Sequence, residues 1–261
     1  MITHWLDGTW AIALTQAAAA VLLVAVVLLV ARRHGISMIP ETSWAMLRGF
    51  VQVVAVGSVL AVLLRGPAWT GVIVLLAMFV AAASIARRRA KGIPGAFGLI
   101  LASLLIGAGS VIVVMTALGV MRAEISTLVP VGSMLLSNAM NACTQMLERL
   151  GSDIDAHRGD IETKLALGGP PSACVAPYVE SAVRASMIPQ VNTMTALGIV
   201  FIPGLMSGMV LAGADPVQAA VYQFVVIAMI LAAGGLTAMT AAVLVRSRFF
   251  TAAEQLVAPA T

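Results

Sequence analysis

The chain has little charge, few aromatic residues and almost no cysteine. Asp, Glu, Lys and Arg make up 10% of its 261 residues, against roughly a quarter in soluble globular proteins. This shortage of charge argues against a soluble domain. Cys143 and Cys174 are its two cysteines, and neither has partner ligands at zinc-binding spacing. The sequence therefore indicates neither a disulfide framework nor a metal cluster.

Short motifs for nucleotide binding and catalysis are also missing. The chain has no GxxxxGK[ST] loop to hold phosphates, no HExxH and no GxSxG. It is therefore expected to bind no ATP or other cofactor itself, and not to be an enzyme. An enzymatic site around His157 and the nearby carboxylates stays an alternative without a supporting signature. Those carboxylates are Asp153, Asp155, Asp160 and Glu162.

Long apolar runs dominate the sequence instead. Hydrophobic residues make up 61% of the chain, and its mean hydropathy is +1.03. Several runs are long enough to cross about 30 Å of hydrocarbon as helices. Because they are solidly apolar rather than alternating, they predict helices and not barrel strands. The predicted fold is an all-α, polytopic transmembrane helical bundle. No basic segment precedes the first run, so it is predicted to be a retained span rather than a signal peptide.

Hydropathy predicts seven spans. They lie at about residues 10–31, 44–64, 69–86, 96–121, 127–147, 191–212 and 217–245. With the N-terminus outside, all of the 15 lysines and arginines except Arg65 and Arg122 fall on the cytoplasmic side. The positive-inside rule therefore favours an N-out, C-in protein of the cytoplasmic (inner) membrane. This bias accounts for the high pI without a nucleic-acid partner, and the lipid bilayer is the expected surrounding.

Residues 148–189 form the one extended charged stretch, and it contains residues that typically begin and end helices. Asp160 is predicted to cap a short helix, which Gly168-Gly169 and the two following prolines end. Ser172 is predicted to cap a second helix. The stretch is either a solvated connector or a docking surface for a cytoplasmic partner, and the pattern leaves both open.

Polar side chains follow one another along the fifth predicted span. Ser133, Ser137, Asn141 and Gln145 recur at intervals of four, so they form a stripe along one helix face. Asn138 and Thr144 stand beside this stripe. Polar groups inside spans either join helices by hydrogen bonds or line a pathway, and so many amides favour the pathway.

Further candidates for this pathway come from other spans. Gln52 lies one helical turn after Arg48, and Asn192 stands where the chain enters the sixth predicted span. Methionines are usually flexible packing residues. The methionines nearest the stripe and the broken span could instead contact a soft metal or a varied substrate, although no firm metal site is predicted. The candidates among them are Met134, Met140, Met206 and Met209.

A helix breaker interrupts the sixth predicted span, which contains FIPGLMSGMVLAGADP at residues 201–216. Pro203 removes a backbone hydrogen bond, which is tolerated in a membrane only against protein or a wet cavity. Gly204 and Gly208 form a GxxxG pair that permits close helix approach. The segment is predicted to be a hinge that lines the path, and simple close packing is the alternative.

Several motifs resemble known transporters. Glu162, followed six residues later by Gly168, is similar to the loop of ABC-transporter permeases that seats in the ATPase subunit, although Ile188-Pro189 falls farther on than in that loop. Three segments together resemble the FetB/YbbM family of ABC permeases, proposed iron exporters related to plant aluminium-tolerance permeases. The segments are SMLLSNAMN at 133–141, IETKLALG at 161–168 and VFIPGLMSGMVLAGADPVQAAVYQ at 200–223.

The resemblance implies one permease domain over residues 1–261, with its coupling region at about 148–189. It implies two copies working with a separate cytoplasmic ABC ATPase subunit, which binds the ATP, and export of a metal ion such as iron. Glu162, Leu165 and Gly168 would couple to that ATPase. The chain departs from the family pattern at five positions, which bears on the substrate more than on the fold. They are Ser137, Ala139, Leu205, Ser207 and Met209.

Two alternatives remain, a stand-alone secondary carrier and a membrane interaction protein that transports nothing. A proton-coupled carrier is expected to have an acid or base within its spans. Every Asp and Glu here falls outside the predicted spans or at their edges, which disfavours proton coupling.

Overall fold

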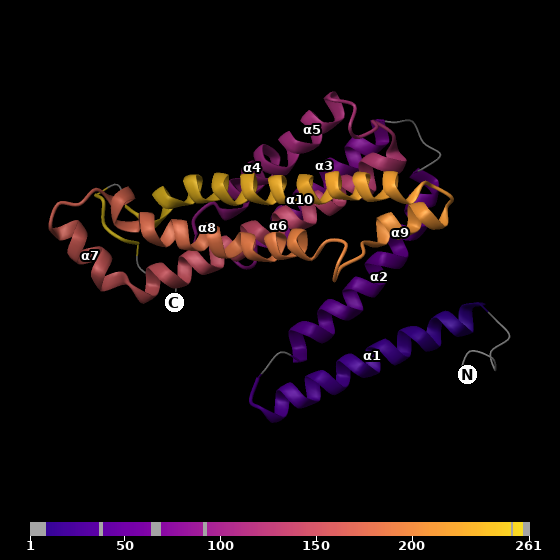
Figure 1. The fold of residues 1–261 in the computed structure, drawn as a ribbon. Helices are drawn as coiled ribbons and strands as arrows, with labels where there is room; N and C mark the ends of the chain where they lie inside the picture. Colours follow the sequence, from indigo (N-terminus) through magenta and orange to yellow (C-terminus); the bar gives the residue numbers. More distant parts are fainter. Residues whose placement is uncertain (1–8, 37–38, 64–68, 91–92, 252, 258–261) are drawn as a thin grey trace. The chain divides into compact units, whose positions relative to one another are not determined.

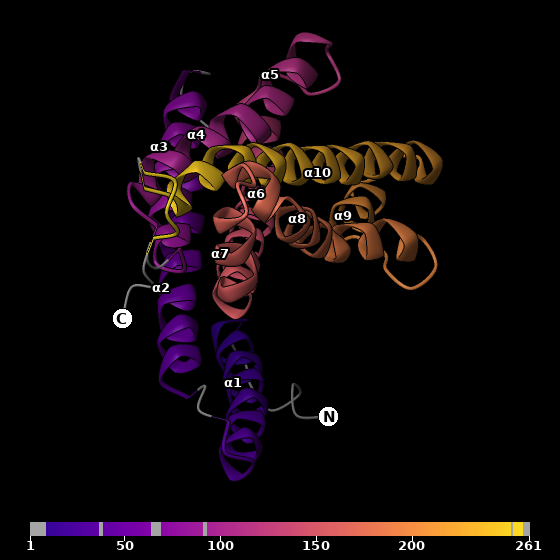
Figure 2. The same cartoon turned by 90° about the vertical axis from the view of Figure 1, so that its left-hand side faces the viewer.

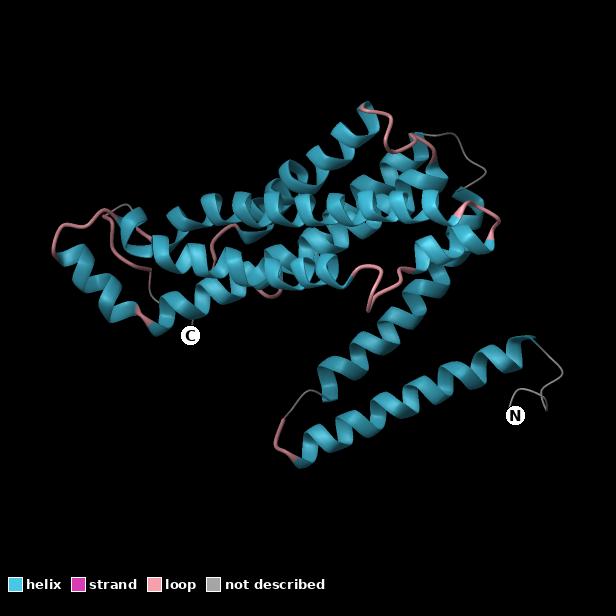
Figure 3. Cartoon of the chain, viewed as in Figure 1, coloured by secondary structure: helices cyan, strands magenta, loops and turns pink. Residues whose placement is uncertain are grey.

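A computed structural model describes residues 9–36, 39–63, 69–90, 93–251 and 253–257. In these residues the elements are helices, joined by turns and two isolated bridges (Figures 1 and 3). This confirms the predicted all-α class. The chain divides into two compact units, Met1–Arg65 and Gly66–Thr261.

The first unit holds α1 (Thr9–Arg33) and α2 (Ile39–Leu63). Arg32 and Arg33 stand in the last turn of α1, where positive charge interacts favourably with the helix dipole. Gly35 then takes a positive φ of 76°, and the N–H of Ile36 closes the turn on the carbonyl of Ala31 at 2.9 Å. Both helices match predicted spans, and α2 begins earlier than predicted.

The second unit is built around two long helices, α6 (Ile125–Ala156) and α10 (Pro216–Val245). These two pack along each other, and α8 (Pro171–Ala196) packs against both. Helix α3 (Trp69–Arg87) covers another side of α6. Figure 2 shows this grouping of α6, α8 and α10. The buried core lies mainly on these helices and on the fourth predicted span.

That fourth span is continuous but has a wide turn at its centre. Helix α4 (Ala96–Leu104) passes through a π-helical turn, η2 (Leu105–Gly109), into α5 (Ser110–Ala117). At this turn Gly107 meets Thr237 of α10 so closely that a Cβ atom on Gly107 would lie 2.6 Å or less from three Thr237 atoms, two of them backbone. Glycine is therefore required for this helix crossing.

Four helical segments are long and apolar enough to cross a membrane, at Leu14–Arg33, Trp69–Arg87, Ala96–Ala117 and Pro216–Phe249. They support a multi-pass membrane protein. All four lie on predicted spans. The predicted span at about 44–64 lies on α2, the one at about 127–147 on α6, and the one at about 191–212 begins on α8.

The sixth predicted span, at about residues 191–212, is interrupted in the structure, and the break lies on the N-terminal side of Pro203. Helix α8 starts in the charged stretch, passes through Pro177 and Pro189, and ends at Ala196. A turn over residues 197–203 follows, and then α9 (Gly204–Leu211) begins. The turn is made by Gly198, whose φ is +80°, and by the hydrogen bond from its N–H to the carbonyl of Phe201 at 3.0 Å. The non-helical segment therefore ends at Pro203.

Two predicted helix caps are also corrected. Helix α7 (Arg158–Ala166) begins directly after His157, so Asp160 stands in its first turn and does not cap it. Helix α8 begins at Pro171, with Pro170 in the cap position instead of Ser172. Proline favours the first helical position because its missing N–H would have no partner there.

Candidate functional site

The predicted polar stripe is confirmed as one face of α6. Ser137, Asn141 and Gln145 are exposed, and Ser133 is half-buried. The opposite side of the same helix is closed, with Leu135, Ala139 and Met146 at 0% exposure. Spacing by four places the polar residues together, and the packing of α3, α8 and α10 covers the other faces.

Several polar groups on α6 bond to their own helix. Asn138 donates from Nδ2 to the carbonyl of Met134 at 2.9 Å, and Thr144 donates to the carbonyl of Met140 at 2.8 Å. Ser133 donates to the carbonyl of Pro130 at 2.7 Å. Groups that are satisfied within one helix do not join it to another. These three side chains therefore make no hydrogen bond to another helix in the described structure.

Gln190 of α8 connects three helices beside the stripe. Its side chain is buried, and Nε2 donates to the backbone carbonyl of Asn138 on α6 at 3.3 Å. On α10, Gly234 makes room for it, since a Cβ atom there would lie 2.6 Å from Nε2. Among the described residues, Oε1 of Gln190 has no hydrogen-bond partner.

Two more buried polar side chains lie on α10. Gln223 is 1% exposed and Thr237 is 0% exposed, and within the described chain neither side chain has a hydrogen-bond partner. An unsatisfied buried polar group costs about 1–3 kcal/mol. Thr237 was not singled out by the sequence, and neither Gln190 nor Gln223 was predicted as a site residue. Their polar character within apolar helices is the signal that could have identified them.

The other predicted path residues are more scattered. Asn192 is exposed on α8 and lines a hollow of about 320 Å³ with Phe201 of the following turn. Met134 on α6 is half-buried, as are Met206 and Met209 on α9, a helix that packs against α10. Gln52 is exposed on α2, in the other unit.

The hinge residues lie where α9 begins. Pro203 is buried and directly precedes the helix, so it starts α9 and does not kink a longer one. A Cβ atom on Gly204 or Gly208 would meet nothing within 4 Å in the described structure. This GxxxG pair therefore makes no close helix contact within the described chain. The strained turns around α9 are instead at Gly198 and at Gly213, whose φ is +95°.

The end of the unit that carries α7 is firmly braced. The ring of His157 stacks on Tyr178 of α8 at 4.9 Å between centroids, and its Nδ1 lies 2.9 Å from the carbonyl of Asp153. Arg158 pairs with Glu162 at 3.3 Å. After α7, Gly168 turns the chain with a φ of +84°. The short helix α7 is thus held by the His157–Tyr178 contact at its start and followed by the Gly168 turn at its end.

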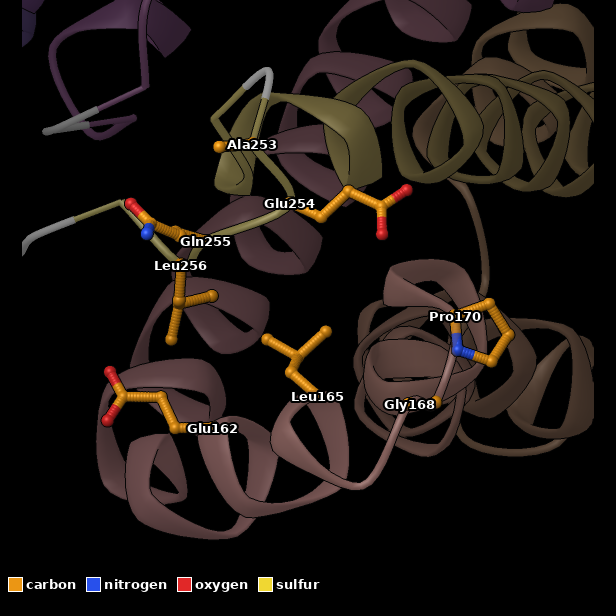
Figure 4. Close-up of a pocket in the computed structure, with 9 residues that line it drawn as sticks. Glu162, Leu165, Gly168, Pro170, Ala253, Glu254, Gln255 and Leu256 are labelled. Atoms are coloured by element: carbon orange, nitrogen blue, oxygen red, sulfur yellow. The ribbon is translucent and has the colours of Figure 1, made fainter.

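The three predicted coupling residues come together at this end. Glu162, Leu165 and Gly168 line one hollow of about 670 Å³ (Figure 4). Nothing in this region resembles an enzymatic metal centre, because the described residues contain no group of three His, Cys, Asp or Glu side chains placed to hold an ion.

These helices, with their apolar exteriors and one polar face, define a multi-pass membrane protein. The chain belongs to the family described as "Uncharacterised protein family (UPF0014)", which it matches over residues 14–250. This confirms the resemblance found in the sequence.

Named relatives cover nearly the whole chain. A UPF0014 membrane protein of Synechocystis sp. is 35% identical, covering 97% of this chain and 96% of its own length. The "Probable iron export permease protein FetB" of Escherichia coli is 31% identical, over 92% of this chain and 93% of that protein. "Protein ALUMINUM SENSITIVE 3" of Arabidopsis thaliana is 28% identical, over 93% and 89%. No solved structure matches the chain.

Proposed function

We propose that the chain is the membrane-spanning permease subunit of an ABC transporter. It exports a metal ion such as iron across the cytoplasmic membrane, with energy from ATP bound to a separate ATPase subunit. Support comes from the similarity to a relative named as a probable iron export permease, and from the absence of a phosphate-binding loop in the sequence.

The braced α7 is the observation that carries the proposal. A short exposed helix transmits force well when both its ends are fixed. Here the stacked His157–Tyr178 pair holds one end. At the other end, the N–H of Gly169 closes α7 on the carbonyl of Lys164 at 3.0 Å, and a Cβ atom on Gly169 would lie 3.1 Å from Sγ of Cys174 on α8. Closure of the ATPase would push on α7, and α8 would carry the displacement to α6 and α10.

The polar face of α6 is the proposed substrate path. Ser137, Asn141 and Gln145 are exposed on a helix whose other faces are packed, and amides facing hydrocarbon are unfavourable. A second copy of the chain would cover this face with its own. Hydroxyl and amide groups both donate and accept, so such a face is self-complementary in a twofold dimer.

The path offers amide and hydroxyl oxygens together with the thioethers of Met134, Met206 and Met209. Oxygen ligands suit harder cations and thioethers softer ones, so the combination fits a borderline metal that passes through without tight binding. The proposed arrangement has seven spans, with the N-terminus outside and the C-terminus inside. The single permease domain over residues 1–261 stays a prediction.

A reconstitution experiment tests the class. The purified chain is placed in liposomes without an ATPase, and concentrative Fe(II) movement is measured under proton and sodium gradients. We expect none. Gradient-driven accumulation in these liposomes would instead identify a stand-alone carrier.

A further inference from the structure

The last described residues fold back on themselves after α10. The 3-10 helix η3 (Arg246–Phe249) leads into a small hairpin, in which Phe250 and Leu256 form an antiparallel bridge. The N–H of Val257 donates to the carbonyl of Phe249 at 2.9 Å. Glu254 lies near the tip with a positive φ of 59°. We call residues 249–251 and 253–257 the C-terminal hairpin.

The C-terminal hairpin is fastened to the beginning of α7. Arg158 donates from Nη2 to the carbonyl of Val257 at 2.7 Å, a short charge-assisted hydrogen bond. The same guanidinium pairs with Glu162 at 3.3 Å and lies 3.9 Å from Asp155, and its side chain is 25% exposed. Phe250 and Leu256 pack against the buried core. The hairpin is therefore held in place beside α7.

The hollow of about 670 Å³ lies between α7 and this hairpin. Glu162, Leu165 and the Gly168–Pro170 turn line it on one side, and residues 253–256 line it on the other. In Figure 4 the side chains of Leu165 and Leu256 extend toward each other across the hollow, and Glu162 and Glu254 stand at different edges. The hollow thus has a pair of facing leucines and two carboxylates at its edges, and more of its lining surface is polar than apolar.

We propose that the C-terminal hairpin is part of the docking site for the ATPase subunit, and that the hollow takes an apolar side chain of that subunit flanked by an arginine or lysine. The proposal rests on the proposed function. Two observations point to this occupant. The hollow contains the three residues to which the sequence resemblance gives a coupling role. Its lining includes two carboxylates and no basic side chain, and of the two carboxylates Glu162 is already paired with Arg158. In addition, no ion pair to Glu254 is found within the described structure.

The hairpin gives the docking site a second connection to the bundle. It continues directly from α10, which packs against α6, α8 and α9. A force applied to the residues that line the hollow would therefore reach α10 through η3. It would also reach α8 through the Gly168 turn. The docking site would act on α8, which carries Gln190, and on α10, which packs against that side chain.

The experiment measures binding of a purified ABC ATPase subunit from the same organism to the full chain in lipid nanodiscs. The test variants are Glu254→Lys, which reverses a charge at the edge of the hollow, and Leu256→Asp, which replaces one member of the facing leucine pair with a charged side chain. Glu180→Lys is the matched control, because Glu180 is exposed on α8, pairs with Arg184 and lies outside the hollow. Glu162→Ala tests the α7 contribution alone.

We expect Glu254→Lys and Leu256→Asp to weaken binding at least tenfold, with Glu180→Lys unchanged. Thermal unfolding of each variant separates lost docking from lost folding, and the exposed Glu254 makes its variant informative even if Leu256→Asp unfolds. If Glu162→Ala weakens binding while Glu254→Lys binds as the wild type does, the hairpin proposal is overturned and the function stands. If the wild-type chain binds no ATPase subunit, both are overturned.

Discussion

Gln190 on α8 donates a hydrogen bond from its side chain to the backbone carbonyl of Asn138 on α6, at 3.3 Å. The bond lies over Gly234 of α10, so three helices meet at one buried amide. Asn138 is adjacent to the exposed stripe. A displacement of α8 would therefore act directly on Asn138, next to the polar stripe of the proposed path.

Gly234→Ala tests this junction. The new methyl group would lie 2.6 Å from Nε2 and 2.8 Å from Oε1 of Gln190, so the amide must move and its hydrogen bond is lost. We expect a loss of about 1–3 kcal/mol in the free energy of unfolding, measured by thermal unfolding in detergent. Gly235→Ala is the control, because its methyl group would meet the mobile end of Met187 at 3.2 Å. Equal losses in the two variants would contradict the account.

Gly107→Ala tests the crossing at the π-helical turn. Its methyl group would overlap the backbone nitrogen and Cα of Thr237, at 2.5 and 2.6 Å, and backbone atoms cannot rotate away. We expect the variant to be severely destabilised and Thr237→Ala not to rescue it. Gly109→Ala should be tolerated, since its nearest neighbour would be the Phe79 ring at 3.7 Å. Expression and size-exclusion profiles give the readout, and rescue by Thr237→Ala would show that the backbones are not in contact.

Gly168→Ala tests the turn after α7. An alanine in the left-handed conformation costs about 1–2 kcal/mol, whereas asparagine adopts it more readily. We expect binding of the ATPase subunit to fall with Gly168→Ala and to be largely kept with Gly168→Asn. If both substitutions bind as the wild type does, the turn does not position the docking site.

The path proposal predicts that the polar faces of two copies meet. In a variant whose native Cys143 and Cys174 are replaced, Ser137→Cys and Asn141→Cys should each form a disulfide between two chains under mild oxidation in membranes. Cysteine at Val113, an exposed α5 position, is the control and should stay monomeric. Monomers at both stripe positions would mean that something other than a second copy covers this face.

Periodic features were predictable from the sequence. Residues spaced by four stay on one face of any helix, which is why the α6 stripe and its candidate residues were found. The turn after α7 was found because Gly168 and the following prolines exclude a continuous helix. The all-helical class followed from the apolar runs themselves.

Features that depend on tertiary contacts were not predictable. Pro203 looks like a break inside a span, but the chain turns earlier, where Gly198 adopts a positive φ that its neighbours do not reveal. Pro177 and Pro189 suggest helix ends, yet packing against α6 and α10 keeps α8 continuous through both. The contacts from Gln190 to Asn138 and from Arg158 to Val257 join residues 52 and 99 positions apart, which no local pattern contains.

The central claim is that a separate ATPase powers this chain to move a metal ion. The direct measurement is Fe(II) transport in proteoliposomes that contain the chain and its ATPase subunit, with ATP supplied on the side of the ATPase. We predict transport away from that side that requires ATP, and its loss when Asn138 and Asn141 are both changed to alanine. Transport that proceeds unchanged without ATP, or no transport of Fe(II) or any other metal ion tested, would contradict the account.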